Sequence, residues 1–345
     1  MACANNRDLP RPTNGDSGRA LLCEPTMAQS EPTEGVYLSS VADLERQYGD
    51  SFAAVSRILR LRSPAQIRDP SCIRFALAWE PADAAFAAYP NLKMVCSIGA
   101  GVDGILKCSS LPSDVFVTRV RDAVQAYTMA GFVVWHVVWH HRRMGEYLAS
   151  RSEHKWRWVE SVPVTECTVG VLGLGTMGRA IALALRGLGY RVIVARRTAC
   201  DDYTESGMTI VGGPNSVEVV ASRADLLVNV LPLTAETQSI LNAKLFAAMS
   251  QGSVLIQVGR GAHLVHDDFM AALDNGILSA ASLDVFVDEP LPPWHPYWHD
   301  ARLLITPHIA CESDIGAVVS QVAGCVEDIA QSRPPRYAIS REKGY

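Results

Sequence analysis

The chain has no paired cysteine motif, no long hydrophobic run and no excess of positive charge, and each absence excludes a class of protein. Its nine cysteines are odd in number and scattered, which is typical of reduced intracellular thiols and not of a disulfide framework or a zinc site. The longest apolar run, residues 132–139, includes a histidine and is far shorter than the about 20 residues of a membrane span. With 31 basic against 36 acidic residues, the net charge is −5, so the chain lacks the excess of positive charge that is typical of proteins that bind nucleic acid or an anionic membrane. The N-terminus also lacks the pattern of a secretory signal, so we expect a cytoplasmic protein.

Length and composition predict a globular chain of about two domains. The 345 residues are 48% apolar and 19% charged, which suffices for buried cores and is unlike a disordered or fibrous chain. Residues 1–34 are the exception, because they are rich in small polar residues, Pro and Gly and show no apolar period. We expect them to form a disordered extension, within which Met27 is a candidate translation start.

The region after this extension predicts a small α/β layer. Short apolar runs predict buried strands at residues 36–38, 75–79 and 93–97. The apolar spacing over 43–59 predicts a helix between the first two of them. Residues 123–146 then predict one long, mostly apolar helix that carries Trp135 and Trp139 on one face.

A second unit begins near residue 164 with the first of six continuous apolar runs. Each run predicts a buried parallel strand, because it does not alternate with polar residues. The runs span residues 168–172, 191–195, 226–230, 253–258, 280–286 and 302–306. Helical patterns separate them, so this half of the chain predicts a doubly wound parallel sheet.

The motif GLGTMG directly follows the first of these strands and opens a helix. Gly173 suits the tight turn, Gly175 lets the backbone approach a pyrophosphate, and Gly178 lets helix and strand pack closely. Thr176 and Met177 lie at the helix N-terminus, whose free N–H groups and dipole favour phosphate. The motif therefore predicts a dinucleotide site; the alternative is a glycine turn without a ligand.

The next strand ends in Arg196, Arg197 and Thr198, where an NAD site usually has an acidic residue for the ribose 2′-hydroxyl. Two guanidinium groups and a hydroxyl instead suit the 2′-phosphate of NADP through charge-assisted hydrogen bonds. The first acidic residue beyond them is Asp201. We therefore expect NADPH in preference to NADH, unless the arginines are merely solvated.

Arg260, Glu289 and His308 follow three late strands, at the sheet edge where ligands bind in open α/β folds. Arg260 can grip a carboxylate and polarise the adjacent carbonyl with its planar, permanent charge. His308 can give a proton to a developing alkoxide, and a nearby carboxylate such as Glu289 raises the pKa of an imidazole and fixes its tautomer. Taken alone, each residue could have a purely structural role, in a turn, on the surface or in the core. Together, the three predict reduction of a 2-oxo acid.

The order and spacing of these motifs resemble the D-isomer-specific 2-hydroxyacid dehydrogenase family, over about residues 36–345. The matching segments are CSIGAGVDGI (96–105), GVLGLGTMG (170–178), NVLPLTAET (229–237), LIQVGRGAHL (255–264), LDVFVDEPLP (283–292) and LLITPHIA (303–310). Within the family the chain is most similar to the NADPH-dependent bacterial glyoxylate/hydroxypyruvate reductases of the A type. The cues are ALAWEP, the dibasic loop, EPLPP before a Trp-rich loop, and the C-terminal KGY.

The resemblance implies an α/β protein of two Rossmann-like, doubly wound parallel-sheet domains. The substrate-binding domain would be discontinuous and comprise residues 35–134 and 307–345. The NAD(P)-binding domain would comprise residues 135–306. The long helix would serve as hinge and as the contact of a homodimer.

The resemblance also implies residue roles. Arg260, Glu289 and His308 would be the catalytic residues, and the backbone N–H groups of Ala100 and Gly101 would cradle the substrate carboxylate. The walls of the substrate pocket would include Trp79 and Trp298. Besides the glycine loop, the dibasic loop and His308, the cofactor would contact Leu231, Pro232, Thr237, Val258, Gly259 and Asp284, with Asp284 holding the nicotinamide carboxamide.

We therefore expect an NADPH-dependent reductase that converts glyoxylate to glycolate or hydroxypyruvate to D-glycerate. Two alternatives stay open: the same chemistry on a bulkier 2-oxo acid such as phenylpyruvate, and a nucleotide-sensing protein without catalysis. Gln257, Cys311 and residues 122–127 depart from the family pattern, and these departures bear on which oxo acid is taken.

Other candidate sites are weaker. His136, His140 and His141 have the helical spacing of metal ligands, but no cysteine or carboxylate completes the set, so we expect no metal. The loop 294–299 combines two tryptophans with two histidines, and its contact with the pocket stays open.

Overall fold

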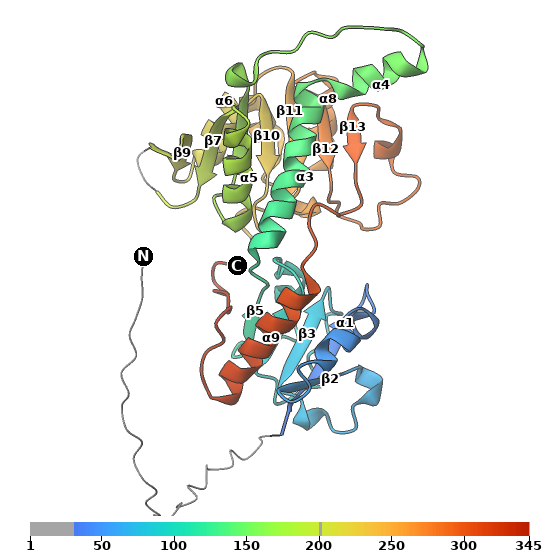
Figure 1. The fold of residues 1–345 in the computed structure, drawn as a ribbon, viewed down its shortest axis with the longest axis vertical. Coiled ribbons are helices and arrows are strands. Elements are labelled where there is room, and N and C mark those ends of the chain that lie inside the picture. The colour runs from blue at the N-terminus through green and yellow to red at the C-terminus, as the bar shows by residue number, and fades with distance from the viewer. Residues whose placement is uncertain (1–30, 200–201, 345) are drawn as a thin grey trace, which may run out of the picture. The chain divides into compact units, whose positions relative to one another are not determined.

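A computed structural model describes residues 31–199 and 202–344 of the chain (Figure 1). Its strands form two sheets, one of five strands and one of eight. The predicted α/β class with two doubly wound parallel sheets is confirmed, although the larger sheet ends in one antiparallel strand. Most of the predicted extension, residues 1–30, lies outside the described residues.

The five-stranded sheet has the order β2-β1-β3-β4-β5, and all of its neighbouring strands are parallel. Its strands are β1 (Thr33–Ser39), β2 (Leu59–Arg62), β3 (Phe75–Trp79), β4 (Met94–Ser97) and β5 (Phe116–Thr118). The helices beside it are α1 (Leu44–Ala53), α2 (Asp103–Leu106) and α9 (Ile315–Ala330). α9 packs on α1, so the last helix of the chain joins the core of the first sheet.

The eight-stranded sheet has the order β13-β12-β11-β10-β6-β7-β9-β8. Its strands are β6 (Thr168–Leu172), β7 (Arg191–Arg196), β8 (Tyr203–Glu205), β9 (Met208–Gly212), β10 (Leu226–Asn229), β11 (Ser253–Gln257), β12 (Leu278–Leu283) and β13 (Leu303–Ile305). Its helices are α3 (Ala123–His141), α4 (Met144–Ser152), α5 (Thr176–Gly187), α6 (Ser216–Arg223), α7 (Ala243–Ala248) and α8 (His266–Asp274). Because seven of these strands run in parallel, their carboxyl ends meet at one edge, which the loops carrying Arg260, Glu289 and His308 follow.

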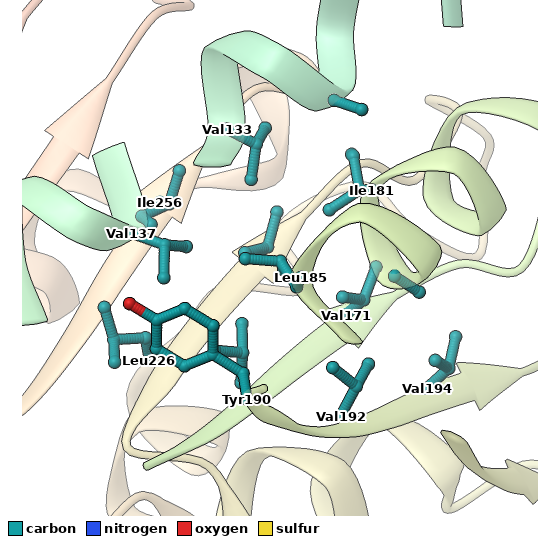
Figure 2. Packing of buried hydrophobic residues seen from close by; sticks show 14 of the residues in the cluster. Val133, Val137, Val171, Ile181, Leu185, Tyr190, Val192, Val194, Leu226 and Ile256 are labelled. Carbon is teal, nitrogen blue, oxygen red and sulfur yellow. The ribbon is translucent and has the colours of Figure 1, made fainter. Parts of the chain in front are cut away.

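The core of the larger sheet explains why its strands are continuous apolar runs. Figure 2 shows Val171, Val192 and Val194 of the central strands facing Ile181 and Leu185 of α5. Val133 and Val137 of α3 pack into the same cluster, and α3 contacts α5 along its length (Figures 1 and 2). Side chains buried on both faces of a parallel sheet make most strand positions apolar, which is the pattern in the sequence; the buried polar residues Asn229, Gln257 and Ser282 lie at or near the carboxyl ends of their strands.

Three elements differ from the sequence predictions. β1 begins at Thr33, two residues inside the predicted disordered extension, because residues 33–36 pair in parallel with β2, where Glu34 also forms ion pairs with Arg60 and Arg62. The single long helix over 123–146 is wrong, since α3 ends at His141 and Arg143 adopts a left-handed conformation, with φ of 53°, before α4 begins. Strands β2, β5, β8 and β9 were not predicted; they are short or lie at or next to a sheet edge.

Two global features bear on the sequence expectations. No helix in the described part of the chain is long and apolar enough to cross a membrane. The six cysteines whose state the structure describes are all free thiols: Cys72, Cys96, Cys108, Cys167, Cys311 and Cys325.

Candidate active site

Arg260, Glu289 and His308 follow three adjacent strands of the larger sheet. Arg260 lies three residues beyond β11, Glu289 lies in the loop after β12, and His308 lies three residues beyond β13. A side chain on Gly261 would overlap the backbone of Phe286 and Val287, so this glycine lets the β12 loop approach Arg260. The structure thus brings the three predicted residues to one edge of the sheet.

His308 and Glu289 form a direct pair. His308 Nδ1 lies 2.7 Å from Glu289 Oε2, and both side chains are about one third exposed. Because a carboxylate only accepts, Nδ1 carries the proton and Nε2 is left to face a ligand. Burial favours a higher pKa for Glu289, but its hydrogen bonds to His308 and the Phe286 N–H, with the charges of His308 and Arg260, hold that pKa below its ordinary value.

Asp284 anchors the loop that carries His308. The carboxylate of Asp284 is 2% exposed and accepts the Thr306 hydroxyl at 2.7 Å and the Ile309 and Ala310 N–H groups at 3.0 and 2.9 Å. The Asp284 carbonyl accepts the N–H of His308 itself at 2.8 Å. These bonds hold His308 in a left-handed conformation, with φ of 55°, which is strained for a residue other than glycine.

Arg260 reaches the other sheet. Its Nε donates to both carboxylate oxygens of Asp103, at 3.1 and 3.3 Å, and its Nη1 donates to the Gly259 carbonyl at 2.8 Å. Its Nη2 lies against Gly101, where any Cβ would overlap it. The predicted carboxylate grip and the predicted backbone cradle at Ala100 and Gly101 therefore come together.

The loop after β4 that holds Ala100 and Gly101 is fixed from within. The buried hydroxyl of Ser97 accepts the Gly99 N–H at 3.1 Å and donates to the Gly101 carbonyl at 2.7 Å. The Trp79 ring lies on Gly99, whose missing side chain makes room for it. A small hollow beside this loop is lined by Trp79, Gly101, Asp103 and neighbouring residues; the role of Trp79 as a wall of the substrate pocket stays a prediction.

A buried polar network holds the backbone of Arg260. Gln257 donates to the Arg260 carbonyl at 2.9 Å, and its Oε1 accepts the Gly259 N–H and the Asn229 amide at 3.1 and 2.8 Å. His263 Nδ1 accepts the Arg260 N–H at 3.1 Å, which leaves the proton on Nε2, 3.3 Å from the Pro232 carbonyl. Burial lowers the pKa of the fully buried His263 to about 4, so the ring is neutral.

The glycine loop has the geometry that a dinucleotide needs. Gly173 has φ of 109°, a conformation that favours glycine, and a side chain on Gly178 would overlap the Gly173 carbonyl. Nothing lies within 4 Å of a Cβ built on Gly175, so the approach to the loop is open. α5 begins at Thr176 and Met177 without any side-chain cap, which leaves its first N–H groups available to a phosphate.

The dibasic end of β7 carries the half-buried Arg196 and the exposed Arg197. Arg196 Nη1 lies 3.4 Å from the Tyr203 hydroxyl, and Arg197 pairs with Glu236 at 3.4 Å. Thr198 is exposed. Planar cations and a hydroxyl at this strand end fit the 2′-phosphate of NADP.

Other predicted cofactor residues lie on the loops that follow β10 and β11. Thr237 donates to the Pro232 carbonyl at 2.7 Å and accepts the Thr234 N–H at 2.9 Å, so its hydroxyl shapes the loop after β10. Leu231 is held through its N–H by Asn229. Val258 is buried in the core, and a Cβ on Gly259 would lie 2.8 Å from His263 Nδ1, so these two residues offer a ligand backbone only.

Some candidates lie elsewhere or have other partners. Trp298 is 48% exposed and donates its indole N–H to the Pro292 carbonyl. His136 and His140 both contact the Ser282 hydroxyl, at 2.8 and 2.7 Å, and His141 contacts the Tyr190 hydroxyl. Among the described residues no group of three His, Cys, Asp or Glu side chains is placed to hold a metal. A wider groove at the opposite edge of the larger sheet contains none of the predicted residues.

Four residues at the site were not identified as site residues from the sequence: Asp103, Ser97, His263 and Asn229. Each acts through hydrogen bonds to a residue that is distant in the chain or to a nearby backbone group. Gln257 was noted only as a departure from the family pattern. The sequence signal that could have identified these residues was their position, because each of them lies within or next to a segment that resembles the family.

The comparisons with known proteins agree with this geometry. The family described as D-isomer specific 2-hydroxyacid dehydrogenase, NAD binding domain, matches residues 134–310. A glyoxylate/hydroxypyruvate reductase A from Serratia proteamaculans is 36% identical over 276 residues, which is 79% of this chain and 87% of that relative. The reductase of the same name from Yersinia enterocolitica is 34% identical over the same shares.

Solved structures give the same result. The D-isomer specific 2-hydroxyacid dehydrogenase from Xanthobacter autotrophicus Py2, in complex with NADPH and MES, has a TM-score of 0.83 and 33% identity over 91% of this chain and 100% of its own. An NADPH-dependent glyoxylate/hydroxypyruvate reductase from Sinorhizobium meliloti, in complex with NADP and sulfate, has a TM-score of 0.82 and 31% identity over the same shares. The resemblance found in the sequence is confirmed, and the chain belongs to the D-isomer specific 2-hydroxyacid dehydrogenase family.

Proposed function

We propose that the protein is an NADPH-dependent reductase of small 2-oxo acids, which converts glyoxylate to glycolate and hydroxypyruvate to D-glycerate. The observation that carries this proposal is the placement of an arginine against a glycine cradle, beside a histidine that is hydrogen-bonded to a glutamate. The relatives named as glyoxylate/hydroxypyruvate reductases support the choice of substrate.

In this proposal, the substrate carboxylate binds between Arg260 and the loop after β4. Arg260 Nη2 and the N–H groups of Ala100 and Gly101 supply the donors, and the guanidinium also polarises the neighbouring carbonyl. The Trp79 ring beside this cradle limits the room for the rest of the oxo acid. A small substrate is therefore favoured over one with a large side chain.

His308 is the proposed proton donor. Glu289 accepts the proton of Nδ1 and so orients the ring with Nε2 toward the substrate oxygen. The carboxylate also stabilises the imidazolium, which gives its proton to the alkoxide oxygen as the carbonyl is reduced. When bound, the nicotinamide supplies the hydride.

The cofactor would be held at both ends of the nucleotide site. The N–H groups at the start of α5 and the glycine loop would take the pyrophosphate, and Arg196, Arg197 and Thr198 would take the 2′-phosphate. The NADP and NADPH complexes of the two neighbouring structures support this assignment. Asp284 has three donors on its carboxylate and keeps acceptor capacity for the nicotinamide carboxamide.

The domain division and the oligomeric state complete the proposal. Residues 35–134 and 307–345 would form the substrate-binding domain and residues 135–306 the nucleotide-binding domain. We propose a homodimer through α3, α4 and the segment after them, because large apolar side chains are exposed there. These are Trp135, Leu148, Trp156 and Trp158. The cytoplasm remains the expected location.

Loss of NADPH absorbance with glyoxylate, hydroxypyruvate, pyruvate and phenylpyruvate, each repeated with NADH, tests the function. We expect rapid turnover of the first two oxo acids with NADPH and slow turnover with NADH. Activity on phenylpyruvate alone would keep the chemistry and overturn the substrate. Absence of turnover on every oxo acid, with NADPH still bound, would overturn the enzymatic function.

A further inference from the structure

The Arg260 guanidinium is oriented by a carboxylate from the opposite sheet. Asp103, the first residue of α2, accepts Arg260 Nε through both of its oxygens, at 3.1 and 3.3 Å. Each side chain of this pair is about one quarter exposed, so water screens the pair only partly. The two residues are 157 positions apart and belong to different sheets.

The directions of the arginine's donors decide what this contact does. Nε is engaged by Asp103 and Nη1 by the Gly259 carbonyl, so two edges of the planar group are fixed. Nη2 is left against Gly101, which belongs to the proposed carboxylate cradle. A guanidinium held at two edges presents the third in one orientation, so little side-chain entropy remains to be lost when a carboxylate binds.

Asp103 is well placed for this task because it shares a loop with the cradle. Ser97 binds both Gly99 and Gly101, and Asp103 follows only two residues later, at the start of a helix. The backbone donors and the carboxylate that orients the arginine are therefore held at a fixed spacing. A carboxylate this close to an anion site also repels the substrate, a cost that positioning of Arg260 offsets.

We propose that Asp103 is a positioning residue for the substrate: it holds Arg260 so that Nη2 and the cradle at Gly101 bind the carboxylate of the 2-oxo acid together. This inference rests on the proposed function, because that function assigns the carboxylate to Arg260. Asp103 itself does not touch the reacting atoms. Its removal therefore weakens binding of the oxo acid more than it slows the chemical step, and it leaves NADPH binding unchanged.

Steady-state kinetics of the full-length wild type, Asp103→Ala and Asp103→Asn test the proposal, with Asp50→Ala, an exposed carboxylate at the end part of α1, as the matched control. For Asp103→Ala we expect KM for glyoxylate to rise by about ten- to a hundredfold, the value of a hydrogen bond to a charged group, while kcat falls only a few-fold. Asp103→Asn keeps an acceptor for Nε and should recover most of this loss. KM for NADPH should stay constant in all variants.

A titration with oxalate in the presence of NADP, followed by tryptophan fluorescence, measures the same site without turnover. We expect oxalate to bind the wild type, the Asp50 control and Asp103→Asn more tightly than Asp103→Ala. An unchanged or lower KM in Asp103→Ala, or equal oxalate affinity in wild type and Asp103→Ala, would overturn the role of Asp103. If the wild type turns over no oxo acid, the proposed function fails, and the oxalate titration still decides on Asp103. Melting temperatures separate these effects from misfolding, and Asp103→Leu, which also removes the acceptor for Nε and should raise KM for glyoxylate in the same way, supplies the test if Asp103→Ala does not fold.

Discussion

The two ends of the proposed site are built differently. At the reaction end, Arg260 and His308 are held by partners that are themselves buried: Gln257, His263 and Asp284. At the phosphate end, Arg196 is half-buried and Arg197 is exposed, and their contacts with the Tyr203 hydroxyl and the Glu236 carboxylate are each 3.4 Å long. The reaction end is preorganised by the fold, whereas the arginines at the phosphate end must adjust their side chains to bind a phosphate.

This difference follows from the chemistry that each end performs. Proton transfer depends on hydrogen-bond geometry within a few tenths of an ångström, so its groups need rigid support before the substrate arrives. Binding of a doubly charged phosphate depends on charge and on long, adaptable side chains, so arginines near the surface suffice to bind it. Substitutions at the reaction end should therefore change turnover steeply, and those at the phosphate end should change affinity moderately.

The steepest test of the reaction end is His308→Gln. Glutamine cannot supply the proton, and general acid catalysis contributes about 10²- to 10⁴-fold, so kcat should fall by at least about a hundredfold. NADPH affinity, measured by fluorescence titration, should stay within a few-fold of the wild type, because the glycine loop and the dibasic loop that would take the phosphates are untouched and His308 is one of many expected cofactor contacts. Turnover within a few-fold of the wild type would contradict the assignment of His308 and remove the contrast between the two ends.

The support behind His308 is tested by Asp284→Asn. The amide group of asparagine places a donor where the carboxylate accepts from Thr306, Ile309 and Ala310, so at least one buried N–H loses its partner. We expect kcat to fall by about tenfold or more as the His308 loop shifts, with a destabilisation of about 1–3 kcal/mol in urea unfolding. Asp267→Asn, an exposed carboxylate in the first turn of α8, is the control and should change neither. Wild-type kcat in Asp284→Asn would show that the loop does not need this anchor.

A pH titration of stability tests the support behind Arg260. His263 has its pKa lowered from 6.5 to about 4 by burial, so below pH 6.5 the unfolded chain binds a proton that the folded chain does not. The free energy of unfolding should therefore fall as the pH drops from 6.5 toward 4, by up to about 1.4 kcal/mol per pH unit for this histidine. His263→Gln should make the slope shallower by about that amount, whereas His154→Gln, an exposed histidine, should leave it unchanged. An identical slope in wild type and His263→Gln would show that His263 is protonated in the folded protein.

The sequence predicted the parts of the reaction end that depend on local pattern. Continuous apolar runs located the central strands, and residues just past the ends of those runs had to meet at one edge of a parallel sheet, which placed Arg260, Glu289 and His308 together. The glycine loop was equally predictable, because each glycine answers a local requirement such as the φ of 109° at Gly173. These are features that a short stretch of chain determines by itself.

The supporting residues could not be predicted, because their roles depend on pairs that only tertiary structure creates. The Asp103 contact with Arg260 spans 157 positions, and Gln257 was noticed as a departure although its amide holds the Arg260 backbone. The end of α3 was missed for a similar reason, since residues 140–143 contain neither Pro nor Gly to mark the end of a helix and only the left-handed Arg143 separates α3 from α4. The periodicity of apolar residues shows which face of a helix or strand is buried. It does not show which other element packs against that face.

At the phosphate end, Arg196→Ala tests whether charge decides the cofactor. We expect kcat/KM for NADPH to fall by about ten- to a hundredfold, the value of hydrogen bonds between charged groups, and kcat/KM for NADH to stay nearly constant. The effect should shrink at high salt, because the arginine is solvent-accessible. Arg191→Ala, at the opposite, exposed end of the same strand, is the control. A loss of equal size with both cofactors would show that Arg196 supports the strand end and does not read the 2′-phosphate.

The smallest expected effect belongs to Glu236, which pairs with Arg197 at 3.4 Å and is 72% exposed. An exposed pair contributes at most about 1 kcal/mol, so Glu236→Gln should leave the melting temperature within a degree or two of the wild type. The same change removes a carboxylate that competes with the 2′-phosphate for Arg197, so KM for NADPH should fall by about two- to threefold at low salt and remain unchanged at high salt. KM for NADH should not move at either salt concentration. A change of tenfold or more, or one that persists in high salt, would mean that this pair is a fixed part of the nucleotide site, and the phosphate end would then be as preorganised as the reaction end.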